Sequence, residues 1–333
     1  MLKVGMLSGW HVHARGYADA LRRMNDAEIV AVYDEEPERG QAWAADLGVP
    51  FDADLDAFLG RGCMDAVACC SPTNRHKDVM VAAAQAGKHI FTEKVMALTV
   101  AECNAIAAAV RQAGVLFCIS MPYRTQPDAL FAKKVAEEKL IGDVTLLRVR
   151  VAHDGASGKW LPPHFYDLET CGGGAMMDLG AHPMYVARWI MGQPVRITSM
   201  FNSFTGCAIE DNAVSLIEFE NKGIAISETS FVSTHSPGCL ELYGTEGSLF
   251  TGGPDGRVRL RSNRIGGTLD GWITPDRLPP ALPSPIRLWV EGILEGKPIP
   301  FGLEEGTRLT ELMENAYLSY RNGGSAQRIT RAS

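Results

Sequence analysis

The sequence has no clustered basic stripe and no excess of positive charge. Its 32 lysines and arginines are outnumbered by 39 acidic residues, which gives a formal net charge of −7. Nucleic-acid-binding domains carry a basic footprint, so nucleic acid and anionic membranes are not expected partners. Apolar runs also stay well below the roughly 20 residues that a membrane-spanning helix needs, so no membrane span is expected.

Paired cysteine motifs and a secretory signal are missing as well. None of the eight cysteines forms a C-x-x-C pair, and several lie in apolar patterns such as Val67–Cys70. The apolar start, Met1–Leu7, is too short for a secretory apolar region and is typical of a first strand instead. These features predict reduced, buried thiols in a cytoplasmic protein.

The first 120 residues alternate short apolar runs with helical patterns, without internal repeats or low-complexity tracts. Helix ends are marked by a capping box, Thr99 with Glu102, and by Gly114. Strands that alternate with helices over short loops predict an α/β, doubly wound parallel sheet of the Rossmann type over residues 1–122, with ligands at the carboxyl ends of its strands. The expected strands are Lys3–Leu7, Glu28–Tyr33, Ala66–Cys70, His89–Thr92 and Val115–Ser120.

After Tyr123 the pattern changes. Helical stretches, a strand over residues 143–151 and a glycine-rich segment are followed by closely spaced strands from Val195 to about Ile273. Turns such as Asn221–Gly223 join these strands, which is typical of hairpins. Residues 123–333 are therefore predicted to form a second, α+β domain with a large, open and mostly antiparallel sheet.

The turn after the first strand lacks the glycines of the dinucleotide-binding fingerprint. Ser8, Trp10 and His13 occupy the three glycine positions. The context of strand, turn and helix is nevertheless right, because amides at the start of a helix from about Ala14 can hold a phosphate. The turn residues expected to bind the cofactor are Ser8, Gly9, Trp10, His11 and Val12.

His11 and His13 could also ligate zinc. No carboxylate or cysteine lies at a suitable spacing nearby in the sequence. No metal site is therefore expected.

Asp34 ends the second expected strand. A carboxylate there can accept hydrogen bonds from an adenosine ribose and repel a 2′-phosphate, and it can also cap the helix that starts at Pro37. Glu35 and Glu36 follow, with no adjacent arginine, so NAD is expected in preference to NADP.

Two further polar segments follow expected strands, at the edge where ligands bind. One is Ser71–His76 and the other is Thr92–Lys94. Capping of the next helix and a generic surface ion pair are the alternatives. The residues expected to bind the cofactor are Ser71, Thr73, Asn74, His76, Glu93 and Lys94.

The segment Cys171–His182 combines three glycines with an acid and an imidazole. Glycines allow a positive φ and a close approach of the backbone to a ligand. Asp178 and His182 are four residues apart, so a helix beginning here would place both on one face. A carboxylate beside an imidazole can hold one tautomer and tune it for proton transfer.

Together, Gly87–Lys94, Ser71–His76, the Gly-Gly-Gly-x-x-x-Asp-x-Gly-x-His pattern and Glu241–Leu249 resemble the Gfo/Idh/MocA family, which is named for glucose-fructose oxidoreductase and inositol dehydrogenase. The resemblance implies a Rossmann domain and a second domain whose open sheet makes dimer or tetramer contacts. It also implies an NAD(P)-dependent enzyme that oxidises or reduces a sugar, a polyol or a related compound.

The resemblance further implies roles for single residues. His182 would accept or return the hydroxyl proton, Lys94 would assist at the oxygen, and Asp178 would orient the substrate or the imidazole. Arg124 resembles a position near cofactor and substrate. The preceding loop supplies His153, Trp160 and His164, which either form the rim of a polyol site or pack the loop.

Two further departures from the family pattern concern the catalytic residues. Val95 stands where a proline usually follows Glu93-Lys94, and Tyr185 stands where many members carry an aspartate. The altered turn and Val95 are also compatible with a second hypothesis about function. In that hypothesis the chain is a non-redox relative, either a sugar- or nucleotide-sensing regulator or a glycosidase that uses NAD transiently.

Overall fold

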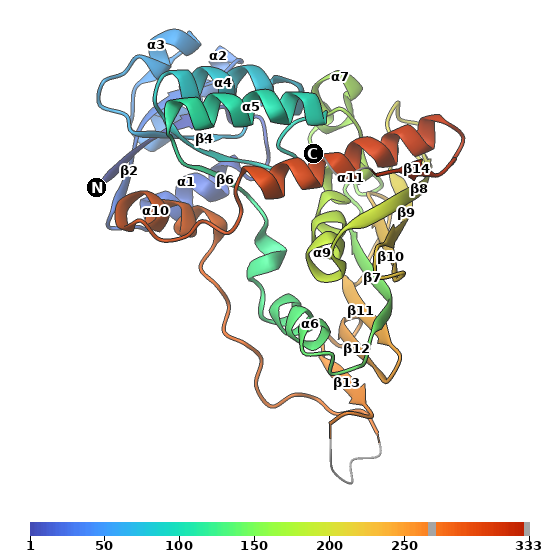
Figure 1. Ribbon diagram of the computed structural model, residues 1–333. Helices are drawn as coiled ribbons and strands as arrows, with labels where there is room; N and C mark the ends of the chain where they lie inside the picture. Colours follow the sequence, from blue (N-terminus) through green and yellow to red (C-terminus); the bar gives the residue numbers. More distant parts are fainter. Residues whose placement is uncertain (266–270, 330–333) are drawn as a thin grey trace. The chain divides into compact units, whose positions relative to one another are not determined.

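The computed structural model describes residues 1–265 and 271–329, and the chain divides into two compact units (Figure 1). The first unit joins Met1–Ser120 to Pro283–Thr310, and the second joins Met121–Leu282 to Glu311–Ser333. This division differs from the predicted one, 1–122 and 123–333, because Pro283–Thr310 returns to the first unit.

The first unit is built on a six-stranded sheet in the order β3-β2-β1-β4-β5-β6, and every pairing in it is parallel. The predicted Rossmann-type sheet is therefore confirmed. The two-residue strand β3 was not predicted, since so short a pairing leaves no periodic pattern. The strands are β1 Leu2–Leu7, β2 Ala27–Tyr33, β3 Phe51–Asp52, β4 Ala66–Cys69, β5 His89–Thr92 and β6 Phe117–Ile119.

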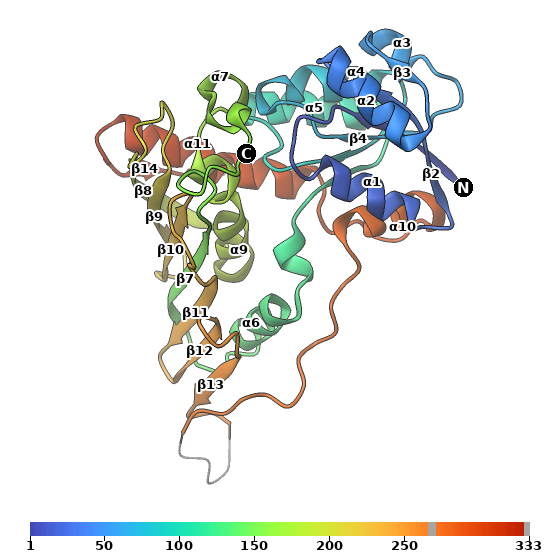
Figure 2. The ribbon, with the colours of Figure 1, turned by 180° about the vertical axis from the view of Figure 1, so that it is seen from behind.

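Helices cover both faces of this sheet (Figures 1 and 2). Helices α1 and α10 lie together on one face, and α4 and α5 lie together on the other. The predicted capping box is present, because the Thr99 hydroxyl accepts the Glu102 amide at 3.2 Å, and Gly114 ends that helix with φ +66°. The helices are α1 Ala14–Arg22, α2 Pro37–Leu47, α3 Leu55–Leu59, α4 His76–Gln85, α5 Val100–Ala113 and α10 Pro285–Glu295.

The second unit contains an eight-stranded sheet in the order β13-β12-β11-β7-β10-β9-β8-β14. Among the described strands of this sheet only β7 and β10 pair in parallel, so the mostly antiparallel sheet is confirmed. The strands are β7 Val144–Ala152, β8 Pro194–Asn202, β9 Asn212–Phe219, β10 Ile224–Ser230, β11 Cys239–Gly244, β12 Gly247–Gly252, β13 Arg259–Ser262 and β14 Gln327–Arg328.

Helices α6 and α9 pack along one face of this sheet, and the described residues place no helix on the other (Figures 1 and 2). That open face exposes Met200, Leu216 and Ile224. Oligomerisation through it stays a prediction. The helices of the unit are α6 Pro127–Glu137, α7 Leu168–Cys171, α8 Ala175–Asp178, α9 Ala181–Met191 and the second half of α11 Leu303–Arg321.

The middle of the open face carries an ion-pair ladder. Arg148 on β7 contacts Glu228 at 2.7 Å and Glu241 at 3.1 Å, and Arg150 contacts Glu228 at 3.3 Å. Burial alone would raise the pKa of Glu228, but the two guanidinium groups lower it below its ordinary value.

Among the residues that the structure places, no helix has the length and apolar character of a membrane span.

Candidate active site

The turn after β1 keeps the backbone of a glycine turn although serine stands at the first glycine position. Ser8 has φ +72°, in the left-handed region that glycine favours. Its hydroxyl donates to Glu35 Oε1 at 3.0 Å and accepts the Trp10 amide at 3.1 Å. These two hydrogen bonds hold the residue in a conformation that would otherwise be unfavourable.

Asp34 fixes the same turn from the end of β2. Its Oδ2 accepts the Gly9 amide at 2.9 Å, and its Oδ1 accepts the Glu36 amide at 2.8 Å. Arg39 donates to both oxygens, at 2.9 and 2.6 Å. The premise that no arginine adjoins Asp34 is therefore wrong, because one turn of α2 carries Arg39 back to the carboxylate.

Polar groups on this side of the unit remain available to a ligand. The Val12 amide has no acceptor among the described residues, and the Val12 side chain is exposed. Asn74 Oδ1 is buried without a hydrogen-bond partner in the described part of the chain. Helix α1 begins at Ala14, as predicted. An amide donor and an orphaned acceptor on two strand-end loops fit a dinucleotide.

His76 has a structural place in the predicted cofactor loop. It is buried, and its Nδ1 and Nε2 lie 2.9 Å from the Val95 carbonyl and 3.1 Å from the Ser71 carbonyl. Burial lowers the pKa of its imidazole. The ring thus joins two loops, and a contact with the cofactor stays a prediction. The Lys94–Val95 peptide bond is cis although Val95 replaces proline.

Glu93 is at the centre of a buried polar network after β5. Its Oε1 contacts His13 Nδ1 at 2.8 Å and accepts the Tyr17 hydroxyl, while its Oε2 accepts the Lys94 amide at 2.9 Å. The Tyr17 oxygen also lies 2.8 Å from the Ser120 hydroxyl, which donates to it because the single Tyr17 proton is shared with Glu93. Sequence reasoning missed Tyr17, since a tyrosine on an amphipathic helix carries no functional signal.

The electrostatics of Glu93 are set by the two histidines of the turn. Burial alone would raise the pKa of this carboxyl, but the imidazoles of His11 and His13 hold it well below its ordinary value. Glu93 is distant from His11 and His13 in the sequence. The search for a metal site, which considered only carboxylates close to the two histidines in the sequence, therefore did not find it.

The three glycines of the second unit serve packing within the protein. Gly172 ends α7 with φ +75°. A Cβ on Gly173 would lie 1.9 Å from the Tyr317 hydroxyl, and one on Gly174 would lie 2.0 Å from the Glu210 carbonyl oxygen. The expected close approach of backbone therefore occurs, but it is to Tyr317 and Glu210.

Glu210 anchors this glycine segment and was missed from the sequence. Its Oε1 accepts the amides of Gly174 and Met176 at 2.9 and 3.0 Å, and the Tyr317 hydroxyl at 2.5 Å. Burial raises the pKa of Glu210. An acid just before a strand gives no sequence signal for such a role.

The single helix expected to carry Asp178 and His182 is instead two helices. Asp178 ends α8, and α9 begins at Ala181. At the break the Gly180 amide donates to Ala175 O at 2.9 Å, and the His182 amide donates to Leu179 O at 3.0 Å. The regular i→i−4 backbone hydrogen bonds, which would place the Asp178 and His182 side chains on one helix face, are therefore interrupted.

His182 is buried and has an aromatic and hydroxyl environment. Its Nδ1 lies 2.9 Å from the Tyr185 hydroxyl oxygen, which also accepts the Tyr123 amide at 3.1 Å. The Tyr123 ring lies 4.8 Å from the imidazole, centroid to centroid. Tyr185, which stands where many family members carry an aspartate, thus provides a hydrogen-bonding partner for His182.

The loop before the glycine segment makes the packing contacts that one of its two interpretations predicts. His153 stacks on Phe231 with centroids 5.0 Å apart, and it lies 4.6 Å from the ring of Trp160. Trp160 itself is largely exposed. His164 lies 5.1 Å from Phe165, centroid to centroid. Rim contacts with a substrate stay a prediction for all three predicted residues.

Arg124 lies in the same unit, with its guanidinium 5.0 Å from the centroid of the Trp189 ring.

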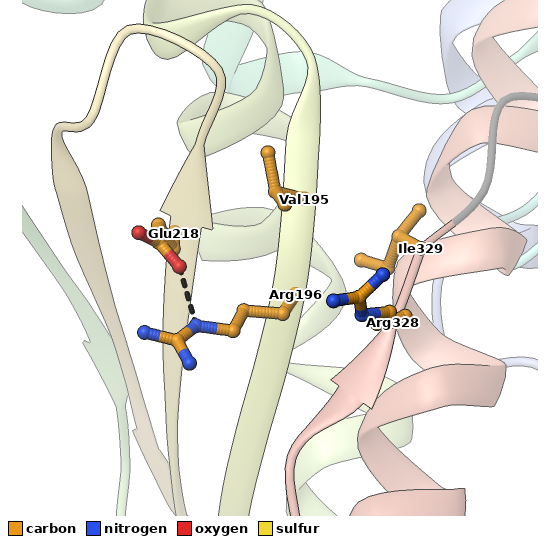
Figure 3. A pocket seen from close by; sticks show the side chains of 5 residues that line it. All are labelled: Val195, Arg196, Glu218, Arg328 and Ile329. Carbon is orange, nitrogen blue, oxygen red and sulfur yellow. Dashed lines mark ion pairs between the residues drawn. The ribbon is translucent and has the colours of Figure 1, made fainter.

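A distinct cavity of about 500 Å³ opens at the β8–β14 edge of the sheet (Figure 3). Arg196 and Glu218 form an ion pair there. None of the predicted site residues lines this cavity, whose lining consists of Val195, Arg196, Glu218, Arg328 and Ile329.

Two family models match the chain. Residues 4–121 match the oxidoreductase family with an NAD-binding Rossmann fold, and residues 130–250 match the GFO/IDH/MocA C-terminal domain. The uncharacterised oxidoreductase YrbE of Bacillus subtilis is 30% identical over 68% of this chain and 67% of its own. The chain belongs to the Gfo/Idh/MocA family. It is an enzyme of the oxidoreductase class, and the resemblance seen in the sequence is confirmed.

Other Gfo/Idh/MocA relatives act on sugars and cyclitols. The D-apiose dehydrogenase of Paraburkholderia graminis is 28% identical over 97% of this chain and 89% of its own. The myo-inositol 2-dehydrogenase of Thermotoga maritima is 26% identical over 70% of each chain. The solved structure of a levoglucosan dehydrogenase in complex with NADH and L-sorbose has a TM-score of 0.86 to this chain. It is 20% identical over 99% of each chain, which shows a shared fold.

The glycine packing gives a direct test in this family member. Gly173→Ala should lower the free energy of unfolding by about 3 kcal/mol or more, because the new methyl group overlaps the Tyr317 hydroxyl in a packed core. Gly16→Ala is the matched control. No atom lies near a Cβ at Gly16 inside α1, so that change should be neutral or stabilising by up to about 1 kcal/mol. Chemical denaturation followed by circular dichroism measures both, and equal effects would contradict the packing argument.

Proposed function

We propose that this enzyme transfers a hydride between NAD and a hydroxyl-bearing carbon of a sugar, polyol or related compound. The observation that carries the proposal is the relation to D-apiose dehydrogenase over 97% of the chain, which spans both units. The buried imidazole of His182, held by a hydroxyl, is suited to exchange a proton with a substrate alcohol.

The first unit supplies the groups proposed to hold the dinucleotide. The turn Ser8–Val12 offers the Val12 amide at the start of α1, and Asn74 offers its orphaned carbonyl oxygen. Asp34 is proposed to face the adenosine ribose with Arg39 beside it. When bound, NAD supplies the nicotinamide ring that exchanges the hydride.

Proton handling is proposed for Lys94 and His182. Lys94 is a buried lysine after β5, and its backbone amide is fixed by Glu93 at 2.9 Å. Its ammonium would stabilise charge on the substrate oxygen, while His182 accepts the hydroxyl proton in oxidation and returns it in reduction. Asp178 is proposed to orient the substrate.

Removal of the proton acceptor tests this assignment. His182→Ala and Lys94→Ala should each lower kcat by about 100-fold or more on any sugar or polyol that the wild type oxidises. NADH affinity, measured by nicotinamide fluorescence, and NAD affinity, measured by calorimetry, should change little in His182→Ala. His235→Ala, at an exposed histidine, is the control. Full activity in His182→Ala would refute its role, and NAD binding without hydride transfer across a broad panel would favour a non-redox relative.

The hydroxyl partner of His182 makes a second prediction, on pH dependence. Tyr185→Asp places a carboxylate near the imidazole, which favours the protonated ring, so the rise of the oxidation rate with pH should move to higher pH. Tyr185→Phe should lower kcat without that displacement, because it removes only a neutral hydrogen bond. Profiles of kcat against pH for the three proteins decide. An unchanged profile in Tyr185→Asp would mean that position 185 does not act on His182.

Cofactor choice is proposed to depend on the Asp34–Arg39 pair. Asp34→Ser removes the charge that would repel a 2′-phosphate and releases Arg39 to bind one. The ratio of kcat/KM for NADP to that for NAD should rise by at least about 10-fold. The double variant Asp34→Ser/Arg39→Ala should lose that gain. If both variants give the same ratio, Arg39 takes no part in the selection.

A further inference from the structure

Three side chains with metal-binding atoms meet in the first unit. His11 and His13 come from the turn before α1, and Glu93 follows β5. His13 Nδ1 lies 2.8 Å from Glu93 Oε1, and His11 Nδ1 lies 3.9 Å from the same oxygen. One ligand atom from each residue can be chosen so that all three lie within 4.8 Å of one another.

The backbone holds this cluster together. The His11 amide donates to the Cys70 carbonyl at 3.0 Å, directly after β4, and the Glu93 amide donates to the Cys69 carbonyl at 3.2 Å. The turn and the acidic residue are therefore fixed to the same strand end. A site placed in this way is largely preorganised, so binding need not order a flexible loop.

The donor set and spacing suit a divalent transition metal. Two imidazoles and one carboxylate are ligands that zinc accepts at about 2.0–2.2 Å, which places tetrahedral ligand atoms about 3.4 Å apart. The separations of 2.8 and 3.9 Å lie on either side of that value, so small side-chain rotations suffice. His11 Nδ1 accepts the His13 amide at 3.2 Å, so this nitrogen is unprotonated, and a metal ion bound by it would replace that amide at its lone pair.

The exposure of the cluster leaves room for a fourth ligand. Glu93 and His11 are almost fully buried, at 1% and 6% exposure, whereas the His13 side chain is 48% exposed. Three protein ligands with one open side are typical of catalytic zinc sites, in which water or a substrate oxygen occupies the fourth position. The Lys94 amide holds Glu93 Oε2, and the Tyr17 hydroxyl donates to Oε1, the oxygen that faces the two histidines.

From this juxtaposition we propose that His11, His13 and Glu93 form a binding site for one zinc-like divalent metal ion with a solvent-derived fourth ligand. The proposal revises the expectation of no metal, which considered only residues close in sequence. It stands on the geometry of the first unit and does not depend on the proposed sugar substrate.

Metal binding can be measured on the full chain without turnover. The protein is stripped with a chelator, dialysed, and titrated with Zn²⁺ by calorimetry and with Co²⁺ by visible absorption. We expect one ion per chain and the ligand-field bands of a four- or five-coordinate Co²⁺ site. His13→Ala should weaken Zn²⁺ binding by at least about 100-fold, since loss of even an outer-shell partner costs about 10–100-fold.

His13→Ala is the informative variant because His13 is half-exposed and its side chain caps no helix amide. Glu93→Gln is a second variant, with circular dichroism as a check on folding. His235→Ala, at an exposed histidine, is the matched control and should bind the ion like the wild type. Binding that is absent, or that is equal in His13→Ala and the wild type, would overturn the proposal and leave a purely hydrogen-bonded cluster. The oxidoreductase proposal would stand in either case, because turnover is not the readout.

Discussion

A buried carboxylate that accepts backbone amides fixes an irregular segment in each unit. Asp34 binds the amides of Gly9 and Glu36, and Glu210 binds those of Gly174 and Met176. Such amides lie outside regular ladders and would otherwise be buried without partners. A buried carboxylate is costly unless it is hydrogen-bonded, so each side of the contact stabilises the other. The turn after β1 and the glycine segment keep their shapes for this reason.

This constraint explains how the chain departs from the usual dinucleotide fingerprint and keeps its turn. A residue with a side chain in the left-handed region costs about 1–2 kcal/mol. Ser8 offsets that cost through hydrogen bonds to Glu35 and to the Trp10 amide. The absence of glycine therefore changes the chemistry of the turn more than its path. The same turn places His11 and His13 beside Glu93, and His13 stands at the third glycine position of the usual fingerprint.

Much of the fold follows from local sequence signals. Five of the six parallel strands, the Thr99 capping box and the start of α1 at Ala14 could be predicted from the sequence, because apolar periodicity and capping residues act over a few neighbours. The return of Pro283–Thr310 to the first unit could not be predicted, because no local pattern indicates which sheet a distant helix packs against. For the candidate site, the family resemblance pointed to Lys94 and His182, whose roles stay predictions. The contacts of Glu210, Tyr17 and Arg39 could not be predicted from the sequence, because only the folded chain creates them.

The central claim, hydride transfer from a carbinol carbon to NAD, can be tested with an isotope label. The enzyme is incubated with NAD⁺ and a polyol or aldose that carries deuterium at its carbinol carbons, and the nicotinamide is recovered for mass spectrometry. Direct hydride transfer would give reduced nicotinamide that contains one deuterium for each turnover. Reduced nicotinamide without the label, or consumption of the substrate with the nicotinamide unchanged at every stage, would contradict it.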